Sequence, residues 1–180
     1  MNICPVCEKE LISPFGDKNS PVLLLFGNPK GDEITNKETL FNGSKNPGNK
    51  EVLIQELGAL GLDLKRMYSM NFFLHQKPNL TTKLARGQWA ECEKFFYTQL
   101  LNIVDNKKVI MLFGADVTKK LTGKGVSGVS SLQVKINFLG NDKIILASVS
   151  PGIALNKSFG EIRLAVLRLK QILVKNELWK

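Results

Sequence analysis

Two stretches of the chain share one pattern of hydrophobic and polar positions. The apolar run that begins at Val22 ends at Gly27-Asn28-Pro29, and a polar loop follows. The run that begins after Lys143 ends in the same way at Ser150-Pro151-Gly152. An unbroken apolar run predicts a strand buried on both faces, and open α/β sheets bind ligands at the carboxyl ends of such strands. Ordinary surface turns use the same residue types, so both interpretations stay open at this point.

Short apolar runs alternate with helical patterns along the rest of the chain. The predicted strands span 22–27, 67–73, 108–113, 132–138 and 143–149. The predicted helices span 49–60, 87–104, 114–122 and 158–176. This alternation predicts an α/β fold, a three-layer α/β/α sandwich around a mainly parallel sheet of four to five strands. The pattern also predicts a hairpin at Gly140-Asn141-Asp142 and loops at 13–20, 35–49 and 122–131.

Composition and charge narrow the class of protein. A chain of 180 residues that is 43% hydrophobic is long enough for one domain, which we expect to span residues 1–180. The 25 Lys and Arg against 16 Asp and Glu give a net charge of +9, which favours nucleic acid as a partner. No apolar run approaches the roughly 20 residues of a membrane helix. With no basic leader at Met1, we expect a cytoplasmic monomer that makes no membrane contact.

The three cysteines and the single histidine are candidate metal ligands. Cys4-Pro5-Val6-Cys7 has a spacing that lets two thiolates reach one metal ion, but such a site needs two more ligands. Cys92 lies in a predicted helix close to Trp89, where a small buried apolar role fits it as well. His75 comes just after a predicted strand. The spacing alone does not show that these residues meet.

Six short motifs follow one another along nearly the whole chain. They are Phe26-Gly27-Asn28-Pro29-Lys30, Phe41-Asn42-Gly43, Asn71 to Pro78, Glu91-Cys92, Val109 to Ala115 and Ser150-Pro151-Gly152. In this order they resemble the uracil-DNA glycosylase superfamily, and most of all its family-four branch. That branch carries G-E-[AG]-P-G, F-V-G, N-V-V-K-C-R-P-P, E-x-C or A-C, V-x-x-L-G-x-x-A and H-P-S at these places. The resemblance implies a uracil-DNA glycosylase-like fold.

The resemblance also implies a metal centre. Cys4, Cys7, His75 and Cys92 take the places of the four ligands, and residues 1–20 form an amino-terminal segment tethered by the metal. Family four holds a 4Fe-4S cluster with cysteines only, whereas three thiolates and one imidazole are a common zinc set. Zinc, a cluster and no metal at all stay open. With four protein ligands the metal would be structural, and no organic cofactor is expected.

By the same resemblance, a pocket for a flipped base lies between the first motifs. Phe41 would stack on the base, and Asn71 would read its hydrogen-bonding edge through the side-chain amide. Gly27 stands where family four has an acidic residue, which leaves room for a larger base. Phe41 equally fits a core aromatic residue, and Asn71 fits a cap at a strand end.

The catalytic positions differ from those of family four. Ser150 stands where that branch has the histidine that stabilises the departing base. Asn28, followed by proline, resembles the G-[IM]-N-P-G loop of the mismatch-specific and single-strand-selective branches, where an asparagine positions the attacking water. Asn28 would therefore position the water, and Asp32 or Glu33 would supply negative charge beside a cation-like sugar. Asp32 and Glu33 equally fit a solvated loop pair.

The loop after Ser150 is the candidate DNA contact. In the superfamily this loop enters the minor groove, and Leu155 would serve as the wedge, with Lys157 and the Ser150 and Gly152 positions against the backbone. Leu155 equally fits the first buried turn of the last helix. Further lysines on loops around the predicted cleft would add phosphate contacts: Lys30, Lys45, Lys50 and Lys124.

These features lead to one expected function and two alternatives. We expect a DNA glycosylase that flips a uracil or a modified pyrimidine out of DNA and hydrolyses its N-glycosidic bond. A bulky modified cytosine of phage DNA fits the missing side chain at Gly27, which would suit a role in DNA repair or phage defence. The first alternative is a catalytically silent module that binds nucleic acid or a nucleotide. The second is a structural zinc protein whose charge serves only solubility.

Overall fold

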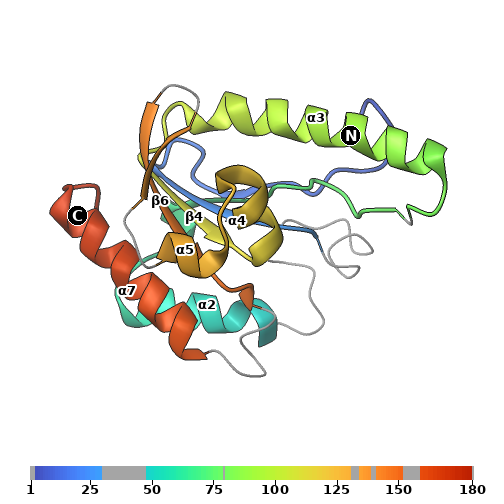
Figure 1. The fold of residues 1–180 in the computed structure, drawn as a ribbon. Helices are drawn as coiled ribbons and strands as arrows, with labels where there is room; N and C mark the ends of the chain where they lie inside the picture. Colours follow the sequence, from blue (N-terminus) through green and yellow to red (C-terminus); the bar gives the residue numbers. More distant parts are fainter. Residues whose placement is uncertain are drawn as a thin grey trace.

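The protein, described here by a computed structural model, is built around one β-sheet (Figure 1). The structure describes residues 3–29, 48–78, 80–130, 134–138, 141–151 and 159–179. The strands are β1 (Phe15–Gly16), β2 (Val22–Phe26), β3 (Tyr68–Asn71), β4 (Val109–Phe113), β5 (Val134–Phe138) and β6 (Asn141–Ser148). The helices are α2 (Gly48–Ala59), η1 (Leu64–Arg66, a 3-10 helix), α3 (Lys83–Val104), α4 (Ala115–Thr122), α5 (Val126–Ser130) and α7 (Phe159–Lys175).

The sheet is mixed, with a parallel centre. Its strand order is β1-β3-β2-β4-β6-β5. The four central strands β3, β2, β4 and β6 run parallel, and β1 and β5 pair antiparallel at the two edges. The predicted α/β class and mainly parallel sheet are confirmed. Strand β3 lies on one side of β2, and the next strand of the centre, β4, lies on the other side. The direction in which strands are added to the sheet therefore reverses between β2 and β4. Open α/β sheets form their ligand crevice at such a point.

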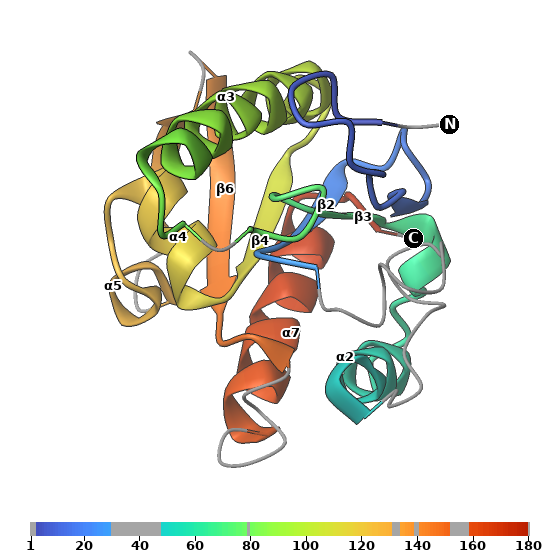
Figure 2. The ribbon, with the colours of Figure 1, turned by 90° about the vertical axis from the view of Figure 1, so that its right-hand side faces the viewer.

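Two apolar cores lie on opposite faces of the sheet. Leu23 and Leu25 of β2 face α3 and α4, whereas Leu24 and Phe26 face α2 and α7. Figures 1 and 2 show these helices as layers on the two sides of the sheet. Every residue of β2 and β4 is buried, because parallel strands covered on both faces expose neither.

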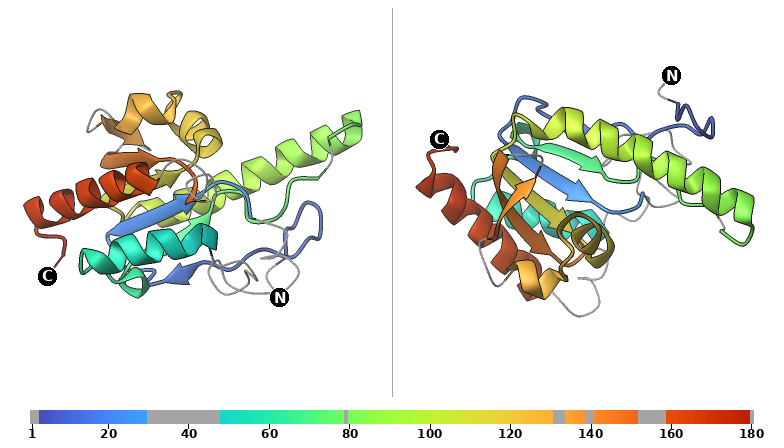
Figure 3. Two further views of the ribbon diagram at one scale, coloured as in Figure 1. Left: turned by 90° about the horizontal axis from the view of Figure 1, so that it is seen from below. Right: turned by 45° about the horizontal axis from the view of Figure 1, so that its top comes forward.

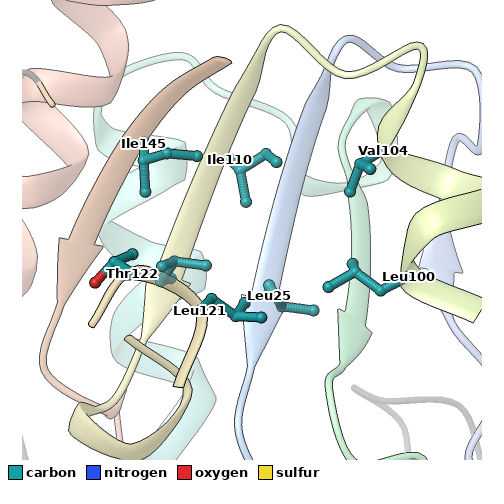
Figure 4. Close-up of a pocket in the computed structure, with 8 residues that line it drawn as sticks. Leu25, Leu100, Val104, Ile110, Leu121, Thr122 and Ile145 are labelled. Carbon is teal, nitrogen blue, oxygen red and sulfur yellow. The ribbon is translucent and has the colours of Figure 1, made fainter. Parts of the chain in front are cut away.

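A small gap remains in the core between the sheet and helices α3 and α4 (Figure 4). Its lining residues are Leu25, Leu100, Val104, Ile110, Leu112, Leu121, Thr122 and Ile145. The gap has a volume of about 10 Å³, which is no more than the space one water molecule needs, and apolar cavities of this kind stay dry. It is a packing gap and not a ligand site.

Helix α3 contains Cys92, one of the four candidate metal ligands. Its first turn is capped by Thr82, whose Oγ1 accepts from the backbone N of Ala85 at 3.1 Å. A helix of 22 residues is about 33 Å long, roughly twice the length of a five-residue strand, so its first half extends beyond the carboxyl edge of the sheet. Figure 3 shows this extension, and Figure 2 shows the amino-terminal segment beside it.

The loop predictions need two corrections. Residues 122–131 contain the helix α5, and residues 13–20 contain the two-residue strand β1. Both elements are too short to show a hydrophobic period of their own, so only tertiary contacts reveal them. Strands β5 and β6 pair antiparallel, as the hairpin prediction required, while residues 139–140 between them lie outside the described chain. Most of the predicted loop 35–49 also lies outside it.

Candidate functional site

A tight turn near the amino terminus presents two cysteines in one direction. The backbone N of Glu8 donates to the carbonyl of Cys4 at 2.9 Å, and the backbone N of Cys4 donates to Lys9 at 2.8 Å. Ile3 and Glu10 form an antiparallel bridge below this turn. Glu8 has a φ of 59°, a left-handed conformation that closes the turn. The Cys-Pro-Val-Cys segment therefore folds as a small knuckle.

His75 and Cys92 complete a four-residue cluster around this turn. The Sγ atoms of Cys4 and Cys92 are 3.8 Å apart, and the Sγ of Cys7 is 3.2 Å from the Nε2 of His75. All four ligand atoms lie within 4.8 Å of one another. Cys4, Cys92 and His75 are almost fully buried, and no disulfide forms among the three cysteines. The structure thus brings together the four residues that the resemblance implied.

The imidazole of His75 is oriented as a metal ligand. Its Nδ1 lies 3.0 Å from the carbonyl oxygen of Gln76, and because a carbonyl only accepts, the proton belongs on Nδ1. This leaves the lone pair of Nε2 directed at the cysteines, an arrangement that is typical of ligating histidines. The rings of Trp89 and Phe96 pack edge-on against the imidazole and fix its plane.

The charge state of the cluster also fits a bound cation. Burial, together with hydrogen bonds with Cys7 and Cys4, raises the pKa of Cys92 to about 12. Burial lowers the pKa of His75, which favours the neutral imidazole that binds metals. A divalent cation supplies the positive charge that buried thiolates otherwise lack, so it reverses the preference of the cysteines for the protonated form.

The ligand distances match the dimensions of a site for a single ion. Two thiolates bound tetrahedrally to zinc at about 2.3 Å lie about 3.8 Å apart. Cys4 and Cys92 have this separation. In a 4Fe-4S cluster each ligand binds a different iron at a corner of a cube, so its ligands stand further apart than those of one ion. The four residues could therefore bind one metal ion.

A second group of residues lies in one row at the carboxyl edge of the sheet. In the register of the parallel strands, Asn71 lies beside Phe26, Phe26 beside Phe113, and Phe113 beside Ser148. The two phenylalanine rings stack at 4.8 Å with an angle of 8° between them. The row faces the layer of α2 and α7, because Phe26 and Phe113 belong to the core on that side.

Buried polar atoms without partners occur at both ends of this row. The Nδ2 of Asn71 and the Oγ of Ser148 are buried, and neither has a hydrogen-bond partner among the described residues. Ser69, two residues before Asn71 on the same face, has an unpartnered Oγ as well. Buried polar groups are nearly always paired in folded proteins, so atoms of this kind near a ligand crevice point to a missing partner.

The loop after β2 lies next to Asn71. The backbone N of Phe72 donates to Phe26 at 2.7 Å, and that of Phe73 donates to Gly27 at 3.2 Å. A Cβ at Gly27 would meet no atom of the described residues within 4 Å, so space lies in front of this residue in the described part of the chain. Asn28 is exposed at the start of the loop.

The remaining predicted residues divide into two groups. Ser150 is half-buried beyond β6, and its Cβ lies 3.8 Å from the place where a Cβ on Gly114 would be. Lys124 is exposed, and Lys50 lies in α2. The other predicted site residues lie outside the described part of the chain: Lys30, Asp32, Glu33, Phe41, Lys45, Gly152, Leu155 and Lys157.

Sequence reasoning missed several buried polar residues, among them Ser148 and Lys107. Ser148 looks like an ordinary strand residue, and Lys107 looks like part of a polar turn. Both are at most 3% exposed. Their burial follows only from the register of β6 and from the closure of the loop before β2. No local pattern in the sequence indicates it.

Comparison with known proteins does not assign the chain to a family. No protein-family profile matches it, and no curated protein sequence matches it. Among the described residues, no helix is both long and apolar enough to cross a membrane. Fold and site together define an α/β protein with a buried cluster of three cysteines and one histidine that could hold a metal ion.

Proposed function

We propose that the protein is a DNA glycosylase whose base pocket lies at the carboxyl edge of β3 and β2. The observation that carries the proposal is the buried Asn71, whose Nδ2 has no partner among the described residues. It lies beside Gly27 and next to the point where the strand order reverses. An amide at such a place suits a nucleobase edge, which offers carbonyl oxygens and ring nitrogens in one plane.

The chemistry of the proposal depends on a small set of groups. Nδ2 of Asn71 donates to a carbonyl oxygen of the flipped base, where negative charge develops as the base departs. Asn28 is exposed on the loop beside this position and holds the attacking water. Asp32 or Glu33 supplies negative charge near the sugar, and Ser150 approaches from the end of β6. The bond between C1′ and the base nitrogen breaks, the oxygen of the water bonds to C1′, and the proton that the water loses balances the one that the departing base takes up, so the base leaves neutral.

The open space at Gly27 supports a substrate larger than uracil. A Cβ there would touch none of the described residues within 4 Å, which supports room for a substituent on the base in front of the loop. This favours a modified pyrimidine, such as a bulky cytosine derivative of phage DNA. We further propose that the fold is of the uracil-DNA glycosylase type, which the parallel β3-β2-β4-β6 centre supports.

We propose that the metal is zinc and that it is structural. The donor set of three thiolates and one imidazole, together with the short distances between them, supports a single tetrahedral ion. Cys4, Cys7, His75 and Cys92 would hold it, and its bonds would pin the amino-terminal turn to α3. Every ligand position is filled by protein, so the ion takes no part in base release.

The positive charge of the chain supports DNA as the partner, even after the lysines that form hydrogen bonds inside the protein are subtracted. The net charge of the chain is +9. Lys107, Lys143 and Lys170 are used inside the protein, where each donates to backbone carbonyl oxygens. The larger part of the positive charge is left for the surface, where it favours phosphate contacts through counterion release.

The proposal is tested by incubating the metal-loaded protein with oligonucleotides that carry uracil and a panel of modified cytosines. We expect abasic sites with at least one base. Asn28→Ala should remove this activity, and Asn71→Ala should lower it by a factor of about 100 or more. Ser69→Ala is the matched control, since it also lies on β3 with an unpartnered buried oxygen but sits further from the edge.

The same experiment separates the alternatives. Salt-sensitive DNA binding without base release from any substrate would favour a silent binding module. Equal losses of activity in Asn71→Ala and Ser69→Ala would contradict the place given to the base pocket, because both variants would then act only through folding.

A further inference from the structure

A second pocket lies at the far end of the carboxyl edge, between the end of β6 and the helices α5 and α7. Its volume is about 390 Å³, above the roughly 300 Å³ at which small-molecule sites begin. Its lining residues are Val126, Ser127, Ala147, Ser148, Val149, Glu161, Leu164, Ala165 and Arg168. None of these residues belongs to the metal cluster or to the Asn71 pocket.

Ser148 is the observation that points to a ligand. Its side chain is 3% exposed, it lines this pocket, and its Oγ has no hydrogen-bond partner among the described residues. A hydroxyl both donates and accepts, so a ligand with either kind of group would satisfy it. Burial of an unpartnered hydroxyl is unfavourable, and ligand binding would remove that cost.

The other walls restrict the chemistry of the ligand. Val126, Val149, Leu164 and Ala165 supply apolar surface for a flat ring, as in most small-molecule sites. The carboxylate of Glu161 only accepts hydrogen bonds, so it favours a ring that carries N–H donors. Cytosine, adenine and guanine carry an exocyclic amino group with two N–H donors, whereas thymine and uracil offer only the single N–H of the ring N3 on that edge.

We propose that this pocket binds a second nucleobase, one with an exocyclic amino group, next to the base that is flipped at Asn71. The inference rests on the proposed action on DNA. β6 is three strands away from β3, so the two positions are about 14 Å apart along one edge of the sheet. The second pocket would therefore read a neighbouring base and give the enzyme a preference for sequence context.

The inference is tested by titrating ¹⁵N-labelled, metal-loaded protein with deoxycytidine and with thymidine. We expect deoxycytidine to shift amide signals of residues 126–127, 147–149 and 161–168, with an affinity about tenfold above that of thymidine. Glu161→Gln should abolish this preference. Ser148→Ala should weaken binding without lowering stability, because it removes an atom that has no partner in the protein.

Two substitutions on α7 that each introduce a larger side chain form a matched pair. Leu164 and Val174 lie on α7 and are 56% and 59% exposed, but only Leu164 lines the pocket. Leu164→Trp should narrow the pocket and weaken nucleoside binding, whereas Val174→Trp should not. Equal affinities for the two nucleosides, or shifts confined to residues around Asn71, would overturn the inference.

Base release in the same preparation reports on the proposed function separately. Nucleoside binding at Ser148 without base release refutes the glycosylase proposal and supports this pocket. Base release without nucleoside-induced shifts of the amide signals around Ser148 supports the glycosylase proposal and refutes this pocket.

Discussion

Lys107 is a buried lysine whose charged amino group binds backbone carbonyl oxygens inside the protein. Its side chain is fully buried, and its Nζ donates to the carbonyl oxygens of Lys18 and Ser20. The same group lies 5.0 Å from the ring centre of Tyr68. Burial, partly offset by the charge of Asp17, lowers the pKa of Lys107 to about 8. The lysine closes the loop that leads into β2, far from the carboxyl edge.

The lowered pKa predicts how stability depends on pH. Between about pH 8 and pH 10 the unfolded chain, in which Lys107 has its ordinary pKa of 10.5, binds more protons than the folded chain. This group therefore makes the free energy of unfolding rise with pH over that interval. Lys107→Met should remove the rise, and at pH 7 the free energy of unfolding should change little, because the loss of the hydrogen bonds to Lys18 and Ser20 is offset by the relief of a buried charge.

Urea unfolding at a series of pH values measures both effects. Lys108→Met is the control, since Lys108 is the exposed neighbour. A rise with pH that persists unchanged in Lys107→Met would contradict the assignment of the effect to this residue.

At the scale of elements, the metal cluster joins three segments that the sheet alone does not hold. In residues 3–12, the N of Ile12 donates to the carbonyl of Leu74, just after β3, at 2.7 Å, and Cys4 and Leu11 pack into the core on that face. The cluster adds bonds from Cys4 and Cys7 to the segment after β3 and to α3. The metal would therefore stabilise the amino-terminal segment and the first half of α3 more than the sheet.

Removal of the metal should loosen these elements selectively. We expect one equivalent of zinc and no visible absorption band in the purified protein. After chelation, or in Cys7→Ser, hydrogen exchange should speed up in residues 3–12 and 83–93 while β2 and β4 stay protected. Thr82→Ala serves as the control, because it weakens the start of α3 by about 1 kcal/mol without removing a ligand. Four iron atoms per chain would contradict the assignment of zinc.

Much of the fold follows from patterns that are local in the sequence, and much of the site does not. The long helices α3 and α7 carry a helical period and the buried strands are unbroken apolar runs, so their presence could be predicted to within a few residues. The five residues of α5 and the two of β1 carry none. Cys4 and Cys7 form a local motif, but Cys92 and His75 join them across 88 and 68 residues, so residue spacing alone could not show the cluster.

At the scale of the whole molecule, two of the three buried polar atoms without a partner among the described residues lie at the carboxyl edge. Asn71 and Ser148 end strands β3 and β6 on one face of the sheet, and the stacked rings of Phe26 and Phe113 separate them. The opposite face holds the packed core that supports α3. Base recognition is therefore proposed for this edge, metal-dependent stability for the amino-terminal segment, and the contacts of Lys107 lie in the interior.

The central claim is that this edge releases a base from DNA. Its most direct measurement is mass spectrometry of small molecules freed from DNA, including heavily modified phage genomes, together with a count of abasic sites. We predict one species of free base, in a one-to-one ratio with abasic sites, and none with Asn28→Ala. No free base from any DNA, with folded and metal-loaded protein, would contradict the claim.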